Sequence, residues 1–386
     1  MDEVTISCLG LLLQEFFNPA EVIDSIDFCL TNEDYDLLLI NLIRETHFRS
    51  IWSEDWINKF TARDFHKLFR MTQDTYGNLL TALSVNSELI KPYTRRNKPV
   101  SFHKKVLISL WYYGREMSMH AIGNQFYTAT STVIILVQEV TDCLCNSMAK
   151  KFITWPNIKE CTIIEEGFRV RANFHNVIGA IDGCHISVKV PSSEQDSYTN
   201  RKMTKSIIVQ AICTSNKIFT NICVGYPGRV HDARVFKNSE IFSIMQNEGP
   251  SSLFYDKYYL LGDSAYPNLS WLITPYKNYG NLSARKRKWN YFHSQTRVDI
   301  ELSFGLLKGR WRRLLYLNVT NISRAPNIIL ACCVLHNFCL VNDDELDEIV
   351  NDVQLDNTSQ TDIQNAIYGT ESGNAKRDEL LNILVP

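Results

Sequence analysis

The sequence predicts an α/β protein in which a mixed sheet flanked by helices follows an all-helical N-terminal module. Two observations support this prediction. Residues 56–150 repeat apolar side chains at helical spacing, and Pro interrupts them only at Pro92 and Pro99. From Asn173 onward, short β-branched runs alternate with helical stretches, as expected for the strands of one sheet and the helices that cover it. A chain of 386 residues has room for both parts.

The composition is that of a globular protein inside a cell. The sequence is 45% hydrophobic and 21% charged, and its eleven cysteines include no CxxC pair. No positively charged leader precedes the first apolar stretch, so we expect reduced thiols rather than disulfides. The longest apolar run, Ile328–Val341, is shorter than the ~20 residues of a membrane span and contains His336 and Asn337. We therefore expect no membrane segment.

Charge is distributed unevenly along the chain, although the net charge is only −2. Nine Lys or Arg residues lie between positions 285 and 313, whereas eleven acids follow position 341. The net charge of the whole chain hides this pattern. A basic segment beside an acidic tail indicates a polyanionic partner.

The helical part divides into two segments. Residues 1–55 look helical and partly acidic, and no chemistry attaches to them. Residues 56–150 contain three consecutive helix signatures, whose predicted N-caps are Ser101, Ser118 and Thr130. The last two predicted helices are separated by only a few residues, as in a helix-turn-helix. Because Ser131–Met148 contains no Lys or Arg, base readout by this helix is not supported. A DNA-contacting module and a bundle that only packs or dimerises both remain open.

The strand-rich part places acids in prominent positions. An apolar strand leads to Asp182 and Gly183, and the carboxylate there either caps the next turn or pairs with a cation. A hairpin, SIIVQAICTSN and KIFTNICVGYPG, precedes a helix that opens with Asp232. The next strand, YYLLG, ends at Asp263, and a basic loop leads to a helix carrying Glu301. The last helix is APNIILACCVLHNFCLV, and an acidic, flexible tail follows up to the terminal segment KRDELLNIL.

The order of these elements is that of an RNase H-like fold. In that order the two central strands bring Asp182 and Asp263 side by side, and a helix lays Glu301 across them. Clustered carboxylates repel one another unless a cation neutralises them, and hard oxygen ligands suit Mg²⁺ or Mn²⁺. Two such ions would activate a water or a 3′-hydroxyl for attack on a phosphodiester. The basic residues around Glu301 would hold the polyanion.

Six sequence blocks, in order, carry a family resemblance. They are AIDGCHI, YTNRK, YPGRVHDARVF, GDSAYP, RVDIELSFGLLKGRWRRL and CCVLHNFC. Together they resemble the DDE domain of the PIF/Harbinger transposases and of the nucleases derived from them, over roughly residues 100–340. One departure is Met203, which stands where a small residue commonly follows NRK.

The resemblance implies a DNA endonuclease with a divalent-metal site. The motif acids carry over to Asp182, Asp263 and Glu301 as catalytic residues, with Asp232 as a fourth metal ligand. The nucleic-acid contacts we expect are Asn200, Arg201, Lys202, Arg285, Lys286, Arg287, Lys288, Arg310, Arg312 and Arg313. The cofactor is Mg²⁺ or Mn²⁺. The partners are DNA and a separate Myb/SANT-like DNA-binding protein, with a homo-oligomer as a further option, in the nucleus and also the cytoplasm.

The expected boundaries follow from these parts. They are 1–55 for the N-terminal helical segment, 56–150 for the helix-turn-helix-like module, 170–341 for the nuclease domain and 342–386 for the acidic tail.

Simpler interpretations compete with several of these assignments. As secondary interpretations, Asp232 is a helix N-cap and Glu301 pairs with Arg297 one turn earlier. Trp311 either stacks on a base or packs against the sheet. For the whole chain, one rival is a domesticated, non-catalytic protein that binds DNA or a nuclear partner. A glycosidase with paired carboxylates is the other, but four acids and a basic groove exceed its needs.

Overall fold

The computed structural model describes residues 60–85, 89, 100–344 and 369–385. The described residues belong to one compact unit. The helical assignment for residues 1–55 and most of the expected acidic tail therefore lie outside the described residues.

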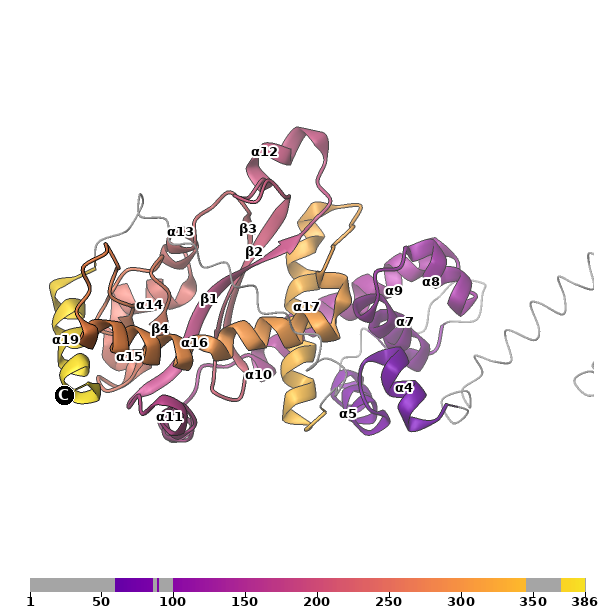
Figure 1. Ribbon diagram of the computed structural model, residues 1–386. Coiled ribbons are helices and arrows are strands. Elements are labelled where there is room, and N and C mark those ends of the chain that lie inside the picture. The colour runs from indigo at the N-terminus through magenta and orange to yellow at the C-terminus, as the bar shows by residue number, and fades with distance from the viewer. Residues whose placement is uncertain (1–59, 86–88, 90–99, 345–368, 386) are drawn as a thin grey trace, which may run out of the picture. The chain divides into compact units, whose positions relative to one another are not determined.

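A five-stranded mixed sheet forms the centre of the described chain (Figure 1). Its strands are β1 (Val177–Ser187), β2 (Ser206–Cys213), β3 (Phe219–Pro227), β4 (Tyr259–Gly262) and β5 (Leu272–Ile273), in the spatial order β3-β2-β1-β4-β5. The first three strands are antiparallel, while β4 runs parallel to β1 and β5 parallel to β4. The predicted hairpin and the pairing of β1 with β4 are both present.

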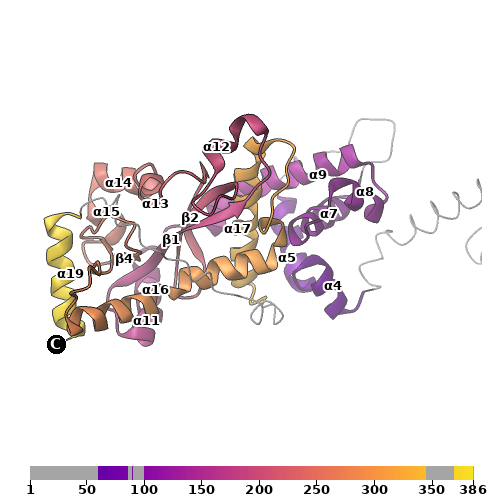
Figure 2. The ribbon, with the colours of Figure 1, turned by 45° about the horizontal axis from the view of Figure 1, so that its top comes forward.

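Helices cover both faces of this sheet. They are α11 (Ile158–Ala172), α13 (Asp232–Lys237), α14 (Glu240–Glu248), α15 (Pro250–Phe254), α16 (Ala284–Arg310), α17 (Ala325–Val341) and α19 (Glu371–Leu384). In Figure 2, α13–α15 lie on one side of β1 and β4, and α11 and α16 lie on the other. One buried cluster includes Ile181 and Phe236, and a second includes Leu261 and Trp289. The α/β expectation with a helix-flanked mixed sheet is confirmed.

Strand β1 is longer than the sequence predicts, and this corrects the position of Asp182. Asp182 lies in the middle of β1 rather than at its end, because β2 continues to pair with β1 as far as Ser187. On the other side of β1, the pairing with β4 stops at Ile181 and Gly262. The sheet is therefore open beside Asp182 on one side only.

Two helix boundaries also differ from the prediction. The basic residues expected in a loop form the first turn of α16, because Ser283 caps this helix by accepting a hydrogen bond from Lys286 N at 3.3 Å. The single helix expected after the hairpin is two helices, α13 and α14, and Ser239 caps the second. The predicted last helix is α17, with Pro in its first turn as expected.

Helix α17 is a core helix. Two helical stretches, Thr130–Phe152 and Ile322–Val341, are long and apolar enough to cross a membrane by composition, and 67% of an 18-residue window of the second is buried inside the protein. Packing against strand β3 and against α16 accounts for its apolar sequence.

The helical module consists of short helices that pack on one another. They are α4 (Ala62–Phe69), α5 (Gln73–Ser84), α7 (Phe102–Gly114), α8 (Met119–Phe126), α9 (Thr130–Cys143), the π-helical turn Leu144–Met148 and α10 (Ala149–Phe152). Ser101 and Ser118 are N-caps as predicted. Thr130 is not, since α9 begins at Thr130 and Ala129 precedes it without a side-chain cap.

The terminal segment KRDELLNIL belongs to helix α19. Its Leu380 and Leu381 are buried in the same cluster as Trp289. This end of the chain is therefore packed against α16 and β5.

Candidate active site

Two of the four predicted acids lie on neighbouring strands. The register of β1 and β4 pairs Ile181 with Gly262, and Asp182 and Asp263 are the next residues. Neighbouring strands run ~4.8 Å apart, so the two carboxylates occupy adjacent positions. Asp182 Oδ1 accepts a hydrogen bond from Gly183 N at 2.8 Å, and Asp263 Oδ1 accepts one from Ala265 N at 2.9 Å.

The third acid, Asp232, reaches the other two across Gly183. A Cβ atom at Gly183 would lie only 2.3 Å from Asp232 Oδ1, a distance that non-bonded atoms do not tolerate. Asp232 is the first residue of α13, and the N-cap position belongs to His231, which makes no side-chain cap bond. The interpretation of Asp232 as an N-cap is therefore wrong.

The fourth acid, Glu301, is joined to Asp182 by a buried arginine. Arg297 is 7% exposed and donates to Asp182 Oδ2 from Nη1 and to Glu301 Oε1 from Nη2, both at 2.6 Å. The i, i+4 pair of Arg297 with Glu301 thus exists, but it is half of a bridge. The sequence indicates only this half, because the bond to Asp182 depends on how α16 crosses β1.

The acids carry more negative charge than Arg297 offsets. Burial and the charges of Asp182 and Asp263 raise the pKa of Asp232 to about 7. Burial and the charge of Asp182 raise the pKa of Asp263 to about 6, although Arg297 opposes the shift. Burial likewise raises the pKa of Glu301. A cluster that holds protons near neutral pH is one in which a bound cation would be favourable.

The donor chemistry of the cluster fits a hard divalent cation, since every candidate ligand is a carboxylate oxygen. Within the part of the chain that the structure describes, no three acidic, His or Cys side chains are gathered closely enough to hold a metal ion. Arg297 separates Asp182 from Glu301, because its guanidinium pairs with both carboxylates. The ligand chemistry of these carboxylates therefore fits a divalent cation. In this structure the positive charge beside them is the Arg297 guanidinium.

The loop carrying Asn200, Arg201 and Lys202 is built around Asn200. This residue is 9% exposed, and its amide donates to Thr204 Oγ1 at 2.8 Å and to Ser206 Oγ at 3.0 Å. Asn200 therefore holds the loop together rather than facing a ligand. Arg201 and Lys202 are exposed. Met203 has φ 60°, a left-handed conformation that explains why a small residue would suit its position.

Two of the three arginines predicted to bind nucleic acid at the end of α16 are structural. Arg310 is buried and pairs with Asp344 at 3.0 Å. Arg313 is 3% exposed, lies over the ring of Tyr112 and donates to the Tyr112 carbonyl at 3.1 Å. Only Arg312 is exposed. Trp311 lies between them and is fully buried, so it packs in the core and cannot stack on a base.

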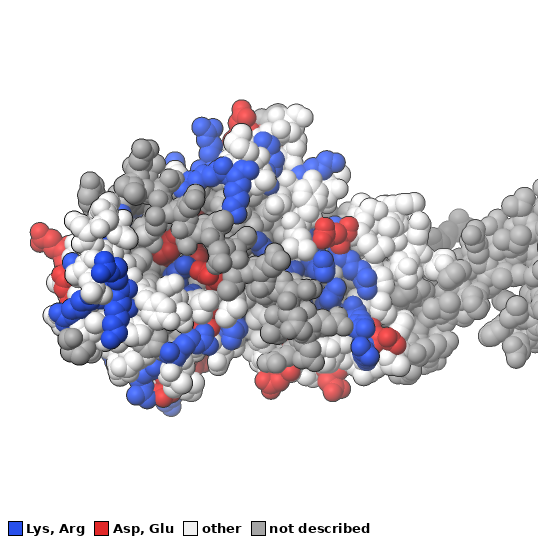
Figure 3. All heavy atoms as spheres, viewed as in Figure 1, with Lys and Arg blue, Asp and Glu red and all other residues white. Residues whose placement is uncertain are grey.

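The basic residues at the start of α16 have mixed roles. Arg285 donates to the Val385 carbonyl and to Asn382 Oδ1, so it ties α19 to α16. Lys286 lies over the ring of Tyr276 at 4.6 Å. Arg287 and Lys288 are exposed. On the face drawn in Figure 3, Lys and Arg gather where α16 begins, and a second group lies near α12 (Gln195–Tyr198).

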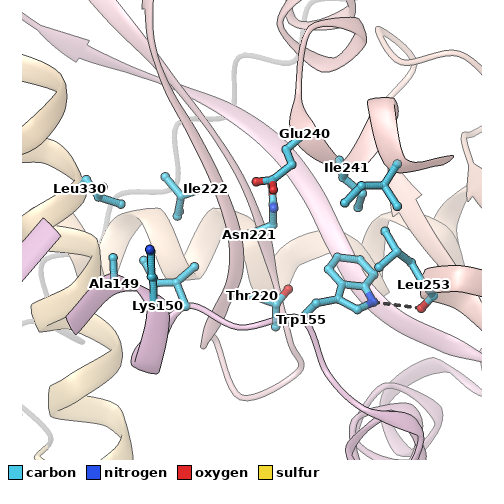
Figure 4. Close-up of a pocket in the computed structure, with 12 residues that line it drawn as sticks. Ala149, Lys150, Trp155, Thr220, Asn221, Ile222, Glu240, Ile241, Leu253 and Leu330 are labelled. Atoms are coloured by element: carbon cyan, nitrogen blue, oxygen red, sulfur yellow. Dashed lines mark hydrogen bonds between the residues drawn. The ribbon is translucent and has the colours of Figure 1, made fainter. Parts of the chain in front are cut away.

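A separate hollow lies beside the edge strand β3 (Figure 4). This cavity of about 350 Å³ has largely apolar walls, including Trp155, whose indole donates to the Leu253 carbonyl at 2.9 Å. Glu240 and Asn221 point toward each other at its centre. None of the four clustered acids lines it, so the acid chemistry is located elsewhere.

The protein is therefore of the α/β class, with a helix-flanked mixed sheet whose central strands carry a site of converging carboxylates. Residues 181–337 match the family model described as DDE superfamily endonuclease. The chain is 26% identical over 319 residues to "Protein ALP1-like" of Arabidopsis thaliana, covering 76% of this chain and 77% of that protein. No solved structure matches the chain.

Two further relatives are similar over comparable lengths. "Antagonist of like heterochromatin protein 1" of Arabidopsis thaliana is 29% identical over 323 residues, 77% of this chain and 81% of that protein. "Putative nuclease HARBI1" of Mus musculus is 28% identical over 265 residues, 66% of this chain and 72% of that protein. The match over residues 181–337 and these similarities confirm the resemblance to the Harbinger transposase-related DDE family.

Proposed function

We propose that the chain is a metal-dependent DNA endonuclease whose RNase H-like domain cleaves phosphodiester bonds at the carboxylate cluster. The convergence of Asp182, Asp232, Asp263 and Glu301 from four elements supports this proposal most strongly. Packing alone does not favour bringing four acids together, because each raises the cost of ionising the others.

Asp182, Asp263 and Glu301 are the proposed catalytic residues, and Asp232 joins them as a ligand. Mg²⁺ or Mn²⁺ bound here would supply charge stabilisation at the phosphate and activation of the attacking hydroxyl. Asp232, with a pKa of about 7, holds a proton in a large fraction of molecules near neutral pH and releases it when positive charge arrives. Arg297 orients Asp182 and Glu301 through its two hydrogen bonds.

The exposed cations among the predicted nucleic-acid contacts are the proposed DNA contacts. They are Arg201, Lys202, Arg287, Lys288 and Arg312. Phosphate contacts of this kind position a nucleic acid without reading its sequence. A separate Myb/SANT-like partner would then supply target choice, in the nucleus or the cytoplasm, and strand transfer would follow cleavage if transposition survives.

The rival interpretation is a non-catalytic nuclear binding factor, and the acid cluster distinguishes the two. A protein that only binds has no use for a cluster in which burial and neighbouring acids raise the pKa values of Asp232, Asp263 and Glu301. All four positions of the acid motif are occupied, so the enzyme is the better-supported proposal.

Nicking of supercoiled plasmid tests the proposal. Wild type, Asp263→Ala and Glu248→Ala are compared with Mg²⁺, Mn²⁺, Ca²⁺ or EDTA; Glu248 is exposed on α14 and serves as the matched acid control. We expect nicking with Mg²⁺ or Mn²⁺ by wild type and Glu248→Ala, and a loss of at least ~100-fold in Asp263→Ala. Nicking that is equal in Asp263→Ala, or that persists in EDTA, would overturn it.

A further inference from the structure

Helix α16 presents one stripe of residues that is exposed at its start and half-buried where it reaches the carboxylate cluster. Successive residues of a helix are ~100° apart, so Arg287, Tyr291, Ser294, Val298 and Glu301 fall on one side of it. The opposite side of α16 is buried and includes Trp289, His293 and Ile300. A ligand lying along this stripe would therefore pass over Glu301.

Tyr291 is the unexplained residue of this stripe. Its side chain is 60% exposed, and its nearest aromatic neighbour is Phe292 at 5.9 Å between ring centroids. Among the described residues its hydroxyl has no hydrogen-bond partner. A large aromatic side chain left in solvent contributes little to folding, and the ring of Tyr291 is accessible to a ligand.

The surroundings of Tyr291 identify the class of ligand. One turn earlier, Arg287 and Lys288 are exposed cations, and one turn later Ser294 and Gln295 are exposed and polar. An aromatic face beside cations suits a nucleic-acid strand, whose bases stack on the ring while its phosphates meet the charges. A protein or lipid partner would instead favour a contiguous apolar surface, and the stripe offers only Tyr291 and Val298.

We propose that Tyr291 stacks on an unpaired base of the DNA strand that enters the site along α16. The ten positions from Tyr291 to Glu301 rise ~15 Å along the helix, which corresponds to roughly four nucleotides of one strand at 3.4 Å each. The base faces of an intact duplex are hidden by stacking, so the ligand is single-stranded or frayed at this point. This inference rests on the proposed function.

Binding of a labelled single-stranded oligonucleotide in EDTA, followed by fluorescence anisotropy, tests the inference without cleavage. The variants are Tyr291→Ala, Tyr291→Phe and Tyr279→Ala. Tyr279 is the matched control, because it is 63% exposed and lies before α16, off the stripe. We expect Tyr291→Ala to weaken binding about 5- to 100-fold, Tyr291→Phe to bind within about 2-fold of wild type, and Tyr279→Ala to be unchanged.

The other outcomes separate the inference from the proposed function. If Tyr291→Phe loses as much affinity as Tyr291→Ala, the hydroxyl bonds to phosphate and stacking is wrong. Equal losses of affinity in Tyr291→Ala and Tyr279→Ala would show that the stripe on α16 is not the binding surface. An equally large loss of Tyr291→Ala on a blunt duplex of the same sequence would also contradict the inference. If wild type binds DNA and Tyr291→Ala binds equally well, only this inference fails; if wild type binds none, the proposed function fails with it.

Discussion

At the scale of single residues, the site depends on one missing side chain and one buried cation. Gly183 has no Cβ, and this allows the Asp232 carboxylate to approach β1. Arg297 bridges Asp182 and Glu301. Gly183 leaves room for the Asp232 carboxylate, and the positive charge of Arg297 offsets the repulsion between carboxylates.

Gly183→Ala should therefore damage the site more than the fold. The added methyl group would lie 2.3 Å from Asp232 Oδ1, so α13 or its acid must move. A displacement of ~1 Å in a catalytic group costs roughly 100-fold in rate, and we expect a loss of that order in plasmid nicking. Gly77→Ala is the control, since nothing lies within 4 Å of its added Cβ; it should retain nicking and gain up to about 1 kcal/mol of stability. Wild-type nicking in Gly183→Ala would contradict the geometry.

Asp232→Asn should stabilise the metal-free protein at high pH. The folded pKa of Asp232 is about 7, above its ordinary value of 3.8, so the native state holds a proton that the unfolded chain has released. The stability that this bound proton provides is therefore lost as pH rises from about 4 to about 7. Above pH 7 the folded protein carries the full cost of the ionised Asp232 carboxylate. We expect Asp232→Asn to gain on the order of 2 kcal/mol at pH 8 and nothing at pH 4.

Urea unfolding in EDTA at the two pH values measures this difference. Glu248→Gln, which removes an exposed charge, should show no such dependence on pH. A loss of stability in Asp232→Asn at pH 8 would instead mean that the carboxylate is favourably paired in the folded protein.

At the scale of elements, the sequence predicts the order of strands and helices well and their ends less well. The alternation of apolar runs placed β1, the β2–β3 hairpin, β4 and α17 correctly. It placed Asp182 at a strand end, because Gly183 resembles a stop, yet β2 supplies hydrogen bonds that carry β1 to Ser187. Those bonds come from another part of the chain, and no local pattern encodes them.

The same limit explains the arginines at the end of α16. RWRR has the composition of a phosphate-binding segment, and local sequence cannot distinguish Arg312 from its neighbours. Arg310 is buried and pairs with Asp344, and Arg313 is buried against the ring of Tyr112 in helix α7. Their roles depend on contacts with residues far away in the sequence, whereas the four acids stand out locally as charges beside apolar strands.

Arg313→Ala should destabilise the protein, while Arg312→Ala should not. Arg313 donates to the buried carbonyl of Tyr112 and to the partly buried carbonyl of Met117, and its loss leaves both acceptors without this donor. Each unpaired group costs about 1–3 kcal/mol, so we expect a loss of roughly 3 kcal/mol in urea unfolding. The exposed Arg312 should change stability by no more than about 0.5 kcal/mol. Equal effects of the two substitutions would show that Arg313 is not buried as described.

At the scale of the whole molecule, the cluster links folding, protons and the cation. The acids come from β1, α13, the end of β4 and α16, so the site exists only when these elements are assembled. A cation that binds the folded chain alone must stabilise all of them together by mass action. Protons compete for the same oxygens, because the pKa values of Asp263 and Asp232 are about 6 and about 7.

Mn²⁺ should therefore raise the melting temperature of wild type, and more so at pH 8 than at pH 5. At a concentration 100 times its Kd, the ion adds about 2.7 kcal/mol. At pH 5 Asp232 and Asp263 hold their protons, and binding must displace them first. Asp182→Asn removes the oxygen charge that sits between Asp263 and Arg297 and should abolish the shift, whereas Glu248→Gln should keep it. The measurement is a thermal melt with and without Mn²⁺ at both pH values. A shift of the same size in Asp182→Asn would place the ion away from β1, and a shift independent of pH would exclude Asp232 and Asp263 as its ligands.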